Sequence, residues 1–345
     1  MVRRSQKSRR KRGSGIAGTL LVLFLVVLCA AGAAGWLVLA PFGPETETFV
    51  EVAPGTSAVR IGKQLEAAGI VRSRYAFDLV RSVKRGTLRA GEYRFDHAAT
   101  VVEVYARIAR GDVYTKTVVV PEGANLFDIA TRLEQAGFGT QQEFLTAARQ
   151  TRLVADLDPG AKSLEGYLFP DTYHFGRRTT PEQIVSAMVK RFRTAAEEIG
   201  LKENVHRVVT LASLVERETA VDGERPLVAS VFENRLSKKM PLMTDPSVIY
   251  GLELQRLWRG SIYASDLKRD TPYNTYLHAG LPPGPVANPG MRSLRAAMEP
   301  AQTDYLYFVA AGDNPQGHSI FANTLEEHNR NVAEYRHALK KAGGR

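Results

Sequence analysis

The hydrophobic pattern begins with one long stretch that contains no charged residue, from 13 to 44. Its apolar heart covers 16–28 and continues through 36–40. About 20 apolar residues in a helix cross the hydrocarbon core of a bilayer, so the pattern predicts a transmembrane helix over 15–41. A cleaved signal peptide is the alternative. Small residues at 30–34 favour it, but the apolar core of a signal peptide is usually only about 7–15 residues long.

Further along the chain, two segments match without gaps at an offset of 68, 54–69 and 122–137. Each has a glycine turn, then apolar positions at helical spacing, then a glycine at the helix end. Extended, apolar-alternating segments precede them at 48–52 and 115–120. We interpret the unit as strand, turn and helix. Modules of this kind commonly bind polymers such as glycans, and the alternative is an ordinary α+β packing unit used twice.

The remaining pattern predicts an α+β fold with three parts: the transmembrane helix, a small strand–helix module over 46–118, and a larger mixed α/β domain over 119–345. The stretch 273–288 is rich in Pro, Gly, Tyr and Asn, and we expect it to shape a site. Helices are predicted over 75–83, 101–109 (capped by Thr100), 181–199, 205–219, 224–236 and 325–340, and strands over 92–95 and 305–309.

The charged residues on the two sides of the apolar stretch predict its orientation in the membrane. Seven lysines and arginines lie within residues 1–12, whereas Glu45, Glu47 and Glu51 follow the apolar stretch. Because basic flanks stay in the cytoplasm, we predict a cytoplasmic tail over 1–14 and a chain that is extracytoplasmic beyond the helix. The tail carries most of the formal net charge of +10. The rest of the chain carries only +3 (10 − 7), so no nucleic-acid-binding face is indicated. The single cysteine excludes an internal disulfide.

Candidate chemistry narrows to carboxylates, because HExxH zinc, Walker A and GxSxG motifs are all absent from the sequence. The predicted helix is apolar on nearly every side over 208–215, and Glu216 and Glu218 follow at its C-terminal end. A carboxyl at the edge of a buried helix is partly desolvated, which favours the protonated form that a general acid needs. Helical periodicity does not choose between the two glutamates. The alternative is an ion pair with Arg217, Arg225 or Arg235.

Several sequence blocks resemble the endolytic murein transglycosylases of bacteria, the YceG-like (MltG) proteins. In order, and covering most of 119–335, the blocks are LEGYLFPDTY at 164–173, LASLVERET at 211–219, VASVFENRL at 228–236, LMTDPSVIYG at 242–251, YNTY at 273–276, GLPPGP at 280–285, and YLYFV at 305–309 with His318 and Phe321. The anchor fits the family too, and the module resembles a LysM domain.

By this resemblance, Glu216 matches the family's catalytic glutamate, and Glu218 is structural or supporting. The implied reaction cleaves the β-1,4 bond between N-acetylmuramic acid and N-acetylglucosamine in nascent peptidoglycan. One residue acts first as acid and then as base, and the muramoyl C6 hydroxyl closes a 1,6-anhydro ring, which helps terminate glycan elongation. Glu165 and Asp171 are expected in a cleft wall. The further candidate substrate-binding residues are Glu218, Asn234, Asp245, Tyr250, Tyr273, Asn274, Tyr276 and His318.

The resemblance also implies a setting. The protein would be a single-pass protein of the bacterial cytoplasmic (inner) membrane, acting on peptidoglycan glycan strands without a metal or organic cofactor. Penicillin-binding proteins or the division or elongation complexes are the implied protein partners. Two other functions stay open at this point. One is a non-catalytic peptidoglycan-binding scaffold, and the other is a hydrolase that uses two carboxylates.

Overall fold

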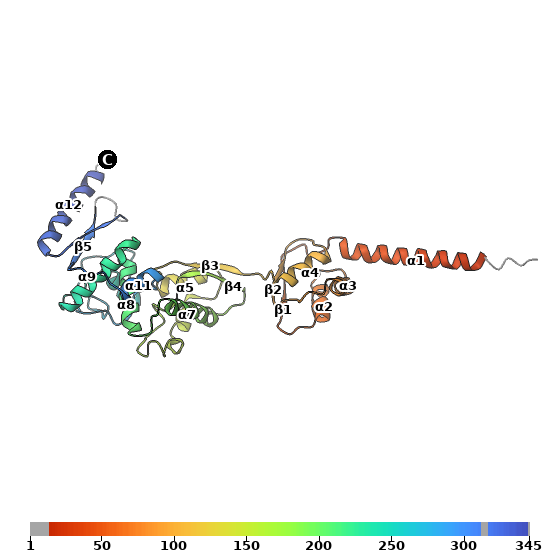
Figure 1. Cartoon of the computed structure of the whole chain (residues 1–345), viewed down its shortest axis with the longest axis horizontal. Helices are drawn as coiled ribbons and strands as arrows, with labels where there is room; N and C mark the ends of the chain where they lie inside the picture. Colours follow the sequence, from red (N-terminus) through yellow and green to blue (C-terminus); the bar gives the residue numbers. More distant parts are fainter. Residues whose placement is uncertain (1–13, 312–316, 344–345) are drawn as a thin grey trace, which may run out of the picture. The chain divides into compact units, whose positions relative to one another are not determined.

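The computed structural model describes residues 14–311 and 317–343, in two compact units, Met1–Thr115 and Lys116–Arg345 (Figure 1). The predicted cytoplasmic tail lies outside the described residues, apart from Ser14. Each unit is considered by itself. The overall architecture is mixed α/β with one apolar N-terminal helix.

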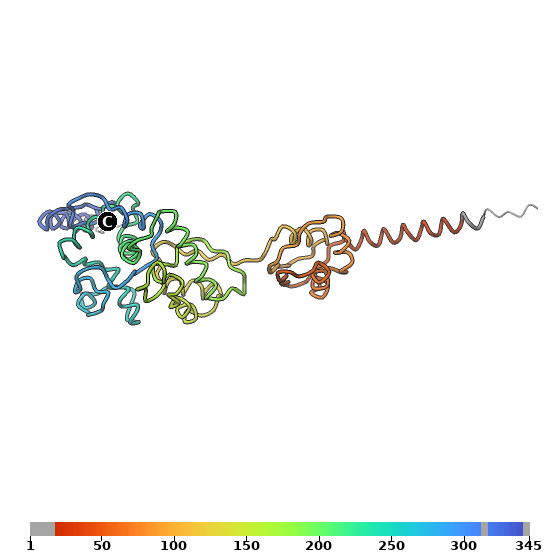
Figure 2. The backbone as a smooth tube through the Cα atoms, turned by 60° about the horizontal axis from the view of Figure 1, so that its bottom comes forward, coloured from red at the N-terminus to blue at the C-terminus, as the bar shows by residue number. Residues whose placement is uncertain are grey.

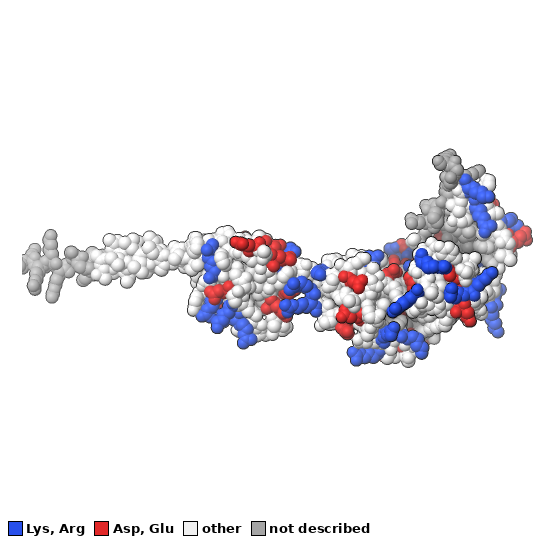
Figure 3. Space-filling view, turned by 180° about the vertical axis from the view of Figure 1, so that it is seen from behind, with Lys and Arg blue, Asp and Glu red and all other residues white. Residues whose placement is uncertain are grey.

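Helix α1 (Ser14–Leu39) is the predicted apolar segment. Its stretch Gly18–Leu39 has 22 residues, enough to cross a bilayer, and none of this stretch is buried inside the unit. Figures 1 and 2 show one continuous helix, and Figure 3 shows it without charged side chains. Its last turn packs on the core of the module through Leu37 and Val38.

The module that follows α1 is a two-stranded antiparallel sheet covered by helices. Strand β1 (Thr48–Val52) pairs with β2 (Gly91–Phe95), so that Thr48 lies opposite Phe95. Val50, Val52, Tyr93 and Phe95 point from the two strands into a core that the helices close. The helices are α2 (Ala58–Ala67), α3 (Arg74–Lys84) and α4 (Val101–Arg110). Thr100 caps α4 through a capping box with Glu103, which confirms the predicted cap.

The predicted internal repeat is confirmed. Strand β3 (Lys116–Val120) and helix α5 (Leu126–Gln135) lie 68 residues after β1 and α2 at both of their bounds. The glycines that end the two helices, Gly69 and Gly137, both adopt positive φ. The second copy continues like the first, with helix α6 (Gln141–Ala147) and strand β4 (Asp171–Phe175), which pairs antiparallel with β3. The repeating unit is therefore strand, helix, helix, strand.

The rest of the second unit is mainly helical and is built around α8 (Val205–Glu218). Every residue of α8 from 208 to 215 is buried, as predicted, and α9 and α11 pack against it. Helix α12 lies beside the small β5–β6 sheet, as Figures 1 and 2 show. The bounds are α7 (Pro181–Glu198), α9 (Arg225–Ser237), α10 (Asp245–Leu254), α11 (Met291–Met298), α12 (Leu325–Gly343), β5 (Tyr307–Ala310) and β6 (Ser319–Ala322), with 3-10 turns at Thr151–Leu153 and Asp222–Glu224.

Candidate active site

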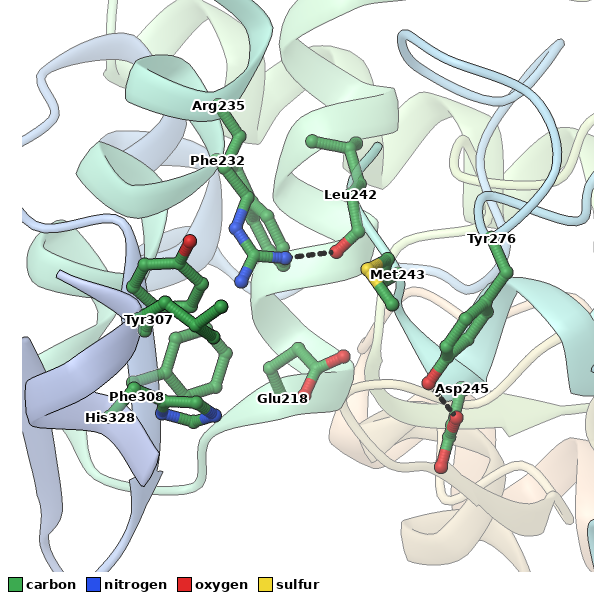
Figure 4. Close-up of a pocket in the computed structure, with 11 residues that line it drawn as sticks. Glu218, Phe232, Arg235, Leu242, Met243, Asp245, Tyr276, Tyr307, Phe308 and His328 are labelled. Atoms are coloured by element: carbon green, nitrogen blue, oxygen red, sulfur yellow. Dashed lines mark hydrogen bonds between the residues drawn. The ribbon is translucent and has the colours of Figure 1, made fainter. Parts of the chain in front are cut away.

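The candidate site is a cleft at the C-terminal end of α8, here called the Glu218 cleft. Helix α8 ends at Glu218 because Thr219 turns to an extended conformation, so the last turn leaves the core. The cleft has a volume of about 390 Å³, and Glu218 points into it (Figure 4). Its lining residues come from α8, α9, the start of α10 with the segment before it, the 273–288 loop, and the β5–α12 region: Glu218, Phe232, Arg235, Leu242, Met243, Asp245, Tyr276, Tyr307, Phe308, Leu325 and His328.

Glu218 has the electrostatic character that a general acid needs. Burial of its carboxyl and the nearby negative charge of Asp245 together raise the pKa of Glu218 to about 7. The positive charges of Arg235 and Arg217 oppose this shift. At neutral pH a large share of the Glu218 side chains is therefore protonated, whereas an ordinary glutamate would be almost fully ionised.

Two polar cleft residues, Arg235 and His328, were not among the predicted site residues. Arg235 donates to the backbone oxygens of Leu306 (2.7 Å) and Leu242 (2.8 Å), which fixes its guanidinium at the cleft wall. His328 stacks on Tyr307, and its buried Nδ1 has no hydrogen-bond partner among the described residues. Burial and the charge of Arg235 lower the pKa of His328, so its ring is neutral at pH 7. The Nδ1 atom is therefore a buried polar atom that the described residues leave unsatisfied, in a side chain that lines the cleft.

Glu216, the predicted catalytic residue, is not among the residues that line this cleft. Its side chain is 5% exposed and forms an ion pair with the equally buried Arg225, with Oε1 3.0 Å from Nη2. Its other oxygen accepts the backbone N–H of Gly290 at 2.9 Å. Arg225 also pairs with Asp222. Both Glu216 oxygens are therefore engaged in holding α8, α9 and the start of α11 together.

Four predicted substrate-binding residues divide between the cleft and the surrounding structure. Asp245 and Tyr276 line the cleft, and the Tyr276 hydroxyl donates to Asp245 at 2.7 Å (Figure 4). Asn234 instead donates to the backbone oxygens of Thr303 and Tyr305. Asn274 is fully buried and holds its own loop through the backbone oxygens of residues 267 and 269. The geometry thus gives both asparagines structural contacts.

The remaining candidates lie outside the Glu218 cleft. Tyr250 and Tyr273 contact each other edge to face, with centroids 5.0 Å apart, and line a separate cavity beside α5 and α6. His318 is largely exposed and lies 3.1 Å from Glu224. Glu165 is buried under the start of α5, where it accepts from Leu126 N–H and Asn288. The expected cleft-wall role of Glu165 does not apply to this cleft, and Asp171 pairs with Arg191 on β4.

Over residues 14–311 and 317–343, no group of three or more His, Cys, Asp and Glu side chains is arranged to hold a metal ion.

Comparison with known proteins assigns the family. The model of the YceG-like family matches residues 50–334, and the chain belongs to that family. It is 34% identical over 313 residues to the endolytic murein transglycosylase of Bacillus subtilis strain 168, covering 84% of this chain and 85% of that protein. The identity to the endolytic murein transglycosylase of Streptococcus pneumoniae D39 is 33% over 91% of this chain, which spans 64% of that longer relative.

A solved structure has the same fold. The crystal structure of a YceG-like protein from Listeria monocytogenes is 32% identical in sequence and superposes with a TM-score of 0.53. The match covers 83% of this chain and 99% of that chain. The family resemblance predicted from the sequence blocks is therefore confirmed.

Proposed function

We propose that the protein is a membrane-anchored endolytic lytic transglycosylase that cleaves peptidoglycan, with Glu218 as its proton donor. The observation that carries this proposal is the Glu218 carboxyl in a cleft with its pKa raised to about 7. The names of the B. subtilis and S. pneumoniae relatives support the same activity. This proposal moves the catalytic role from Glu216 to the second acid of the same sequence block, because Glu216 is committed to Arg225 and Gly290.

The proposed reaction uses one carboxyl twice. Protonated Glu218 gives its proton to the glycosidic oxygen as the bond from muramoyl C1 to that oxygen breaks, and the N-acetylglucosamine fragment leaves with a hydroxyl. The substrate's N-acetyl group stabilises the cationic C1. The Glu218 carboxylate then takes the proton of the muramoyl C6 hydroxyl, whose oxygen bonds to C1. The 1,6-anhydro ring closes, Glu218 is protonated again, and no water is consumed.

The other cleft residues are suited to holding the sugar. The guanidinium of Arg235 offers further N–H donors to carbonyl or carboxylate oxygens, and the ring of His328 lines the same cleft. The face of Tyr276 can pack against a pyranose ring. We propose Asp245 and Tyr276 as substrate contacts in addition to their role in setting the charge around Glu218.

The product decides between this reaction and hydrolysis. Asp245 is a second carboxylate in the same cleft, and two carboxylates are what a hydrolase uses. We expect digestion of purified peptidoglycan to release muropeptides whose muramoyl end lacks one water by mass spectrometry and resists borohydride reduction. Ends that carry the extra water and accept hydride would identify a hydrolase and overturn the proposal. Intact strands bound without cleavage would instead identify a glycan-binding scaffold.

The pH dependence of cleavage follows from the direction in which the pKa of Glu218 is shifted, which is upward. A donor must be protonated, so kcat/KM should decline about tenfold per pH unit above the pKa of about 7. Because Asp245 raises that pKa, Asp245→Asn should move the alkaline limb to lower pH. Rates measured from pH 5 to 9 on soluble glycan strands test both statements. An alkaline limb that stays in place in Asp245→Asn would show that Asp245 does not act on the proton donor.

We further propose the setting of the enzyme. The apolar α1 and its basic flank support a single-pass anchor in the cytoplasmic membrane, with the tail inside and both units outside. There the enzyme would cut nascent glycan at the muramoyl–glucosaminyl bond and so terminate elongation. The strand–helix–helix–strand module is proposed as LysM-like and glycan-binding. Penicillin-binding proteins or the division or elongation complexes are the proposed protein partners.

A further inference from the structure

Helix α3 of the first unit carries apolar side chains on the face that points away from the core. Phe77 and Val80 are buried, whereas Tyr75, Leu79 and Val83 are 68%, 46% and 72% exposed. These three recur every four residues, so they form one stripe along the helix. A helix that faces only water would carry polar residues there.

The stripe borders a groove between α3 and the C-terminal end of α1, here called the α1–α3 groove. It has a volume of about 500 Å³. The α1 wall includes the small residues Ala31, Ala34 and Gly35, which leave the groove open, and the α3 wall includes Leu79 and Val83. Lys84 is the one charged residue among those lining the groove, and it lies at the end of α3.

The groove extends to both sides of Trp36, the residue that marks the membrane boundary, and three of its α1 residues lie on the apolar side. Trp36 is 55% exposed, and the guanidinium of Arg72 stacks 4.4 Å from its ring centroid. A tryptophan beside a cation is typical of the water interface of a transmembrane helix. Ala31 lies five residues earlier, which at the helical rise is about 7 Å further toward the apolar middle of α1. The part of the α1 wall from Ala31 to Gly35 therefore lies at the depth of acyl chains.

We propose that acyl chains of the bilayer fill the α1–α3 groove and that α3 lies in the membrane interface. The apolar surface continues without a break from the span onto α3, and the cationic Lys84 at its edge can reach lipid phosphate while its methylenes stay in apolar surroundings. The module is then seated on the membrane by two apolar elements rather than tethered by one. The inference rests on α1 spanning the membrane and is independent of the chemistry in the Glu218 cleft.

The chain offers a direct test because Cys29 is its only cysteine and lies in α1. The full-length protein is reconstituted in vesicles of phosphatidylethanolamine and phosphatidylglycerol, with a polarity-sensitive fluorophore on one cysteine at a time. The native Cys29 reports on α1. In a Cys29→Ser background, Val83→Cys and Leu79→Cys report on α3. Val113→Cys is the matched control, a 39% exposed valine of the same unit in a cleft lined by Arg94 and Asp96.

Nitroxide-bearing acyl chains should quench the probes at 29, 79 and 83 by about twofold or more and leave the probe at 113 unchanged. Probes at 79 and 83 that resemble the one at 113, while Cys29 is quenched, would overturn the docking of α3 and leave the anchor intact. An unquenched probe at Cys29 would overturn both. Neither outcome affects the proposed activity, which is measured separately on the same samples.

Discussion

Glu218→Gln is expected to abolish the lytic product while the protein stays folded. The substitution keeps the shape of the side chain and removes the proton that the leaving oxygen requires and the base that activates the C6 hydroxyl. General acid–base catalysis contributes about 10²–10⁴-fold, and Glu218 serves both steps, so we expect a loss of at least about 10³-fold in kcat. Glycan binding should remain, because Arg235, His328 and Tyr276 still line the cleft.

The measurement is the rate of anhydro-product release by mass spectrometry, with sedimentation of insoluble peptidoglycan as the binding assay. Glu233→Gln is the matched control. It is the same substitution in the same unit, at a residue that pairs with Arg207 and does not line the cleft. Near-normal product from Glu218→Gln would remove Glu218 from the mechanism and return Glu216 to first place.

Glu216→Gln is expected to destabilise the second unit rather than to abolish chemistry. It leaves Arg225, which is 5% exposed, without its nearest buried partner, although Asp222 still faces it. Breaking a buried pair from one side costs about 3–5 kcal/mol, and the remaining Asp222 favours the lower end, about 3 kcal/mol. For a unit of this size the melting temperature should fall by about 6–12 °C.

Thermal unfolding followed by circular dichroism tests this expectation, with activity measured well below the new melting temperature. Glu122→Gln is the control, because Glu122 lies 3.8 Å from the same arginine but is 48% exposed and should change stability by less than about 1 kcal/mol. A Glu216→Gln protein as stable as the wild type and without activity would contradict the structural role assigned to Glu216.

The sequence predicts the elements of this fold well where periodicity is strong. The repeat at an offset of 68 and the helices α3, α4, α7, α8, α9 and α12 all occur within two or three residues of their predicted bounds. The elements that it missed are short: α6, α10 and α11 have seven, ten and eight residues. Strands β4 and β6 also escaped, because each becomes recognisable only through its partner strand.

The sequence block that carries the site could be predicted, but the directions in which its side chains point could not. Glu216 and Glu218 are two residues apart on one helix, so their side chains point in directions about 160° apart around the helix axis. Which of the two faces a cleft depends on the residues that pack around each of them. Glu216 meets Arg225, which comes from a different helix. For Glu216 the structure shows the alternative role, an ion pair with Arg225. His328 lies on α12, more than 100 residues along the chain from the two glutamates, and no sequence motif linked it to them.

The most direct test of the account is the pKa of Glu218 itself. Infrared difference spectra of the wild type minus Glu218→Gln, recorded across pH, isolate the carbonyl stretch of its protonated carboxyl. If Glu218 is the proton donor, this band is lost with a midpoint near pH 7, as the burial of the carboxyl and its neighbour Asp245 require. A midpoint near 4.5, the ordinary value for glutamate, would leave the cleft without a proton donor at neutral pH and would contradict the account.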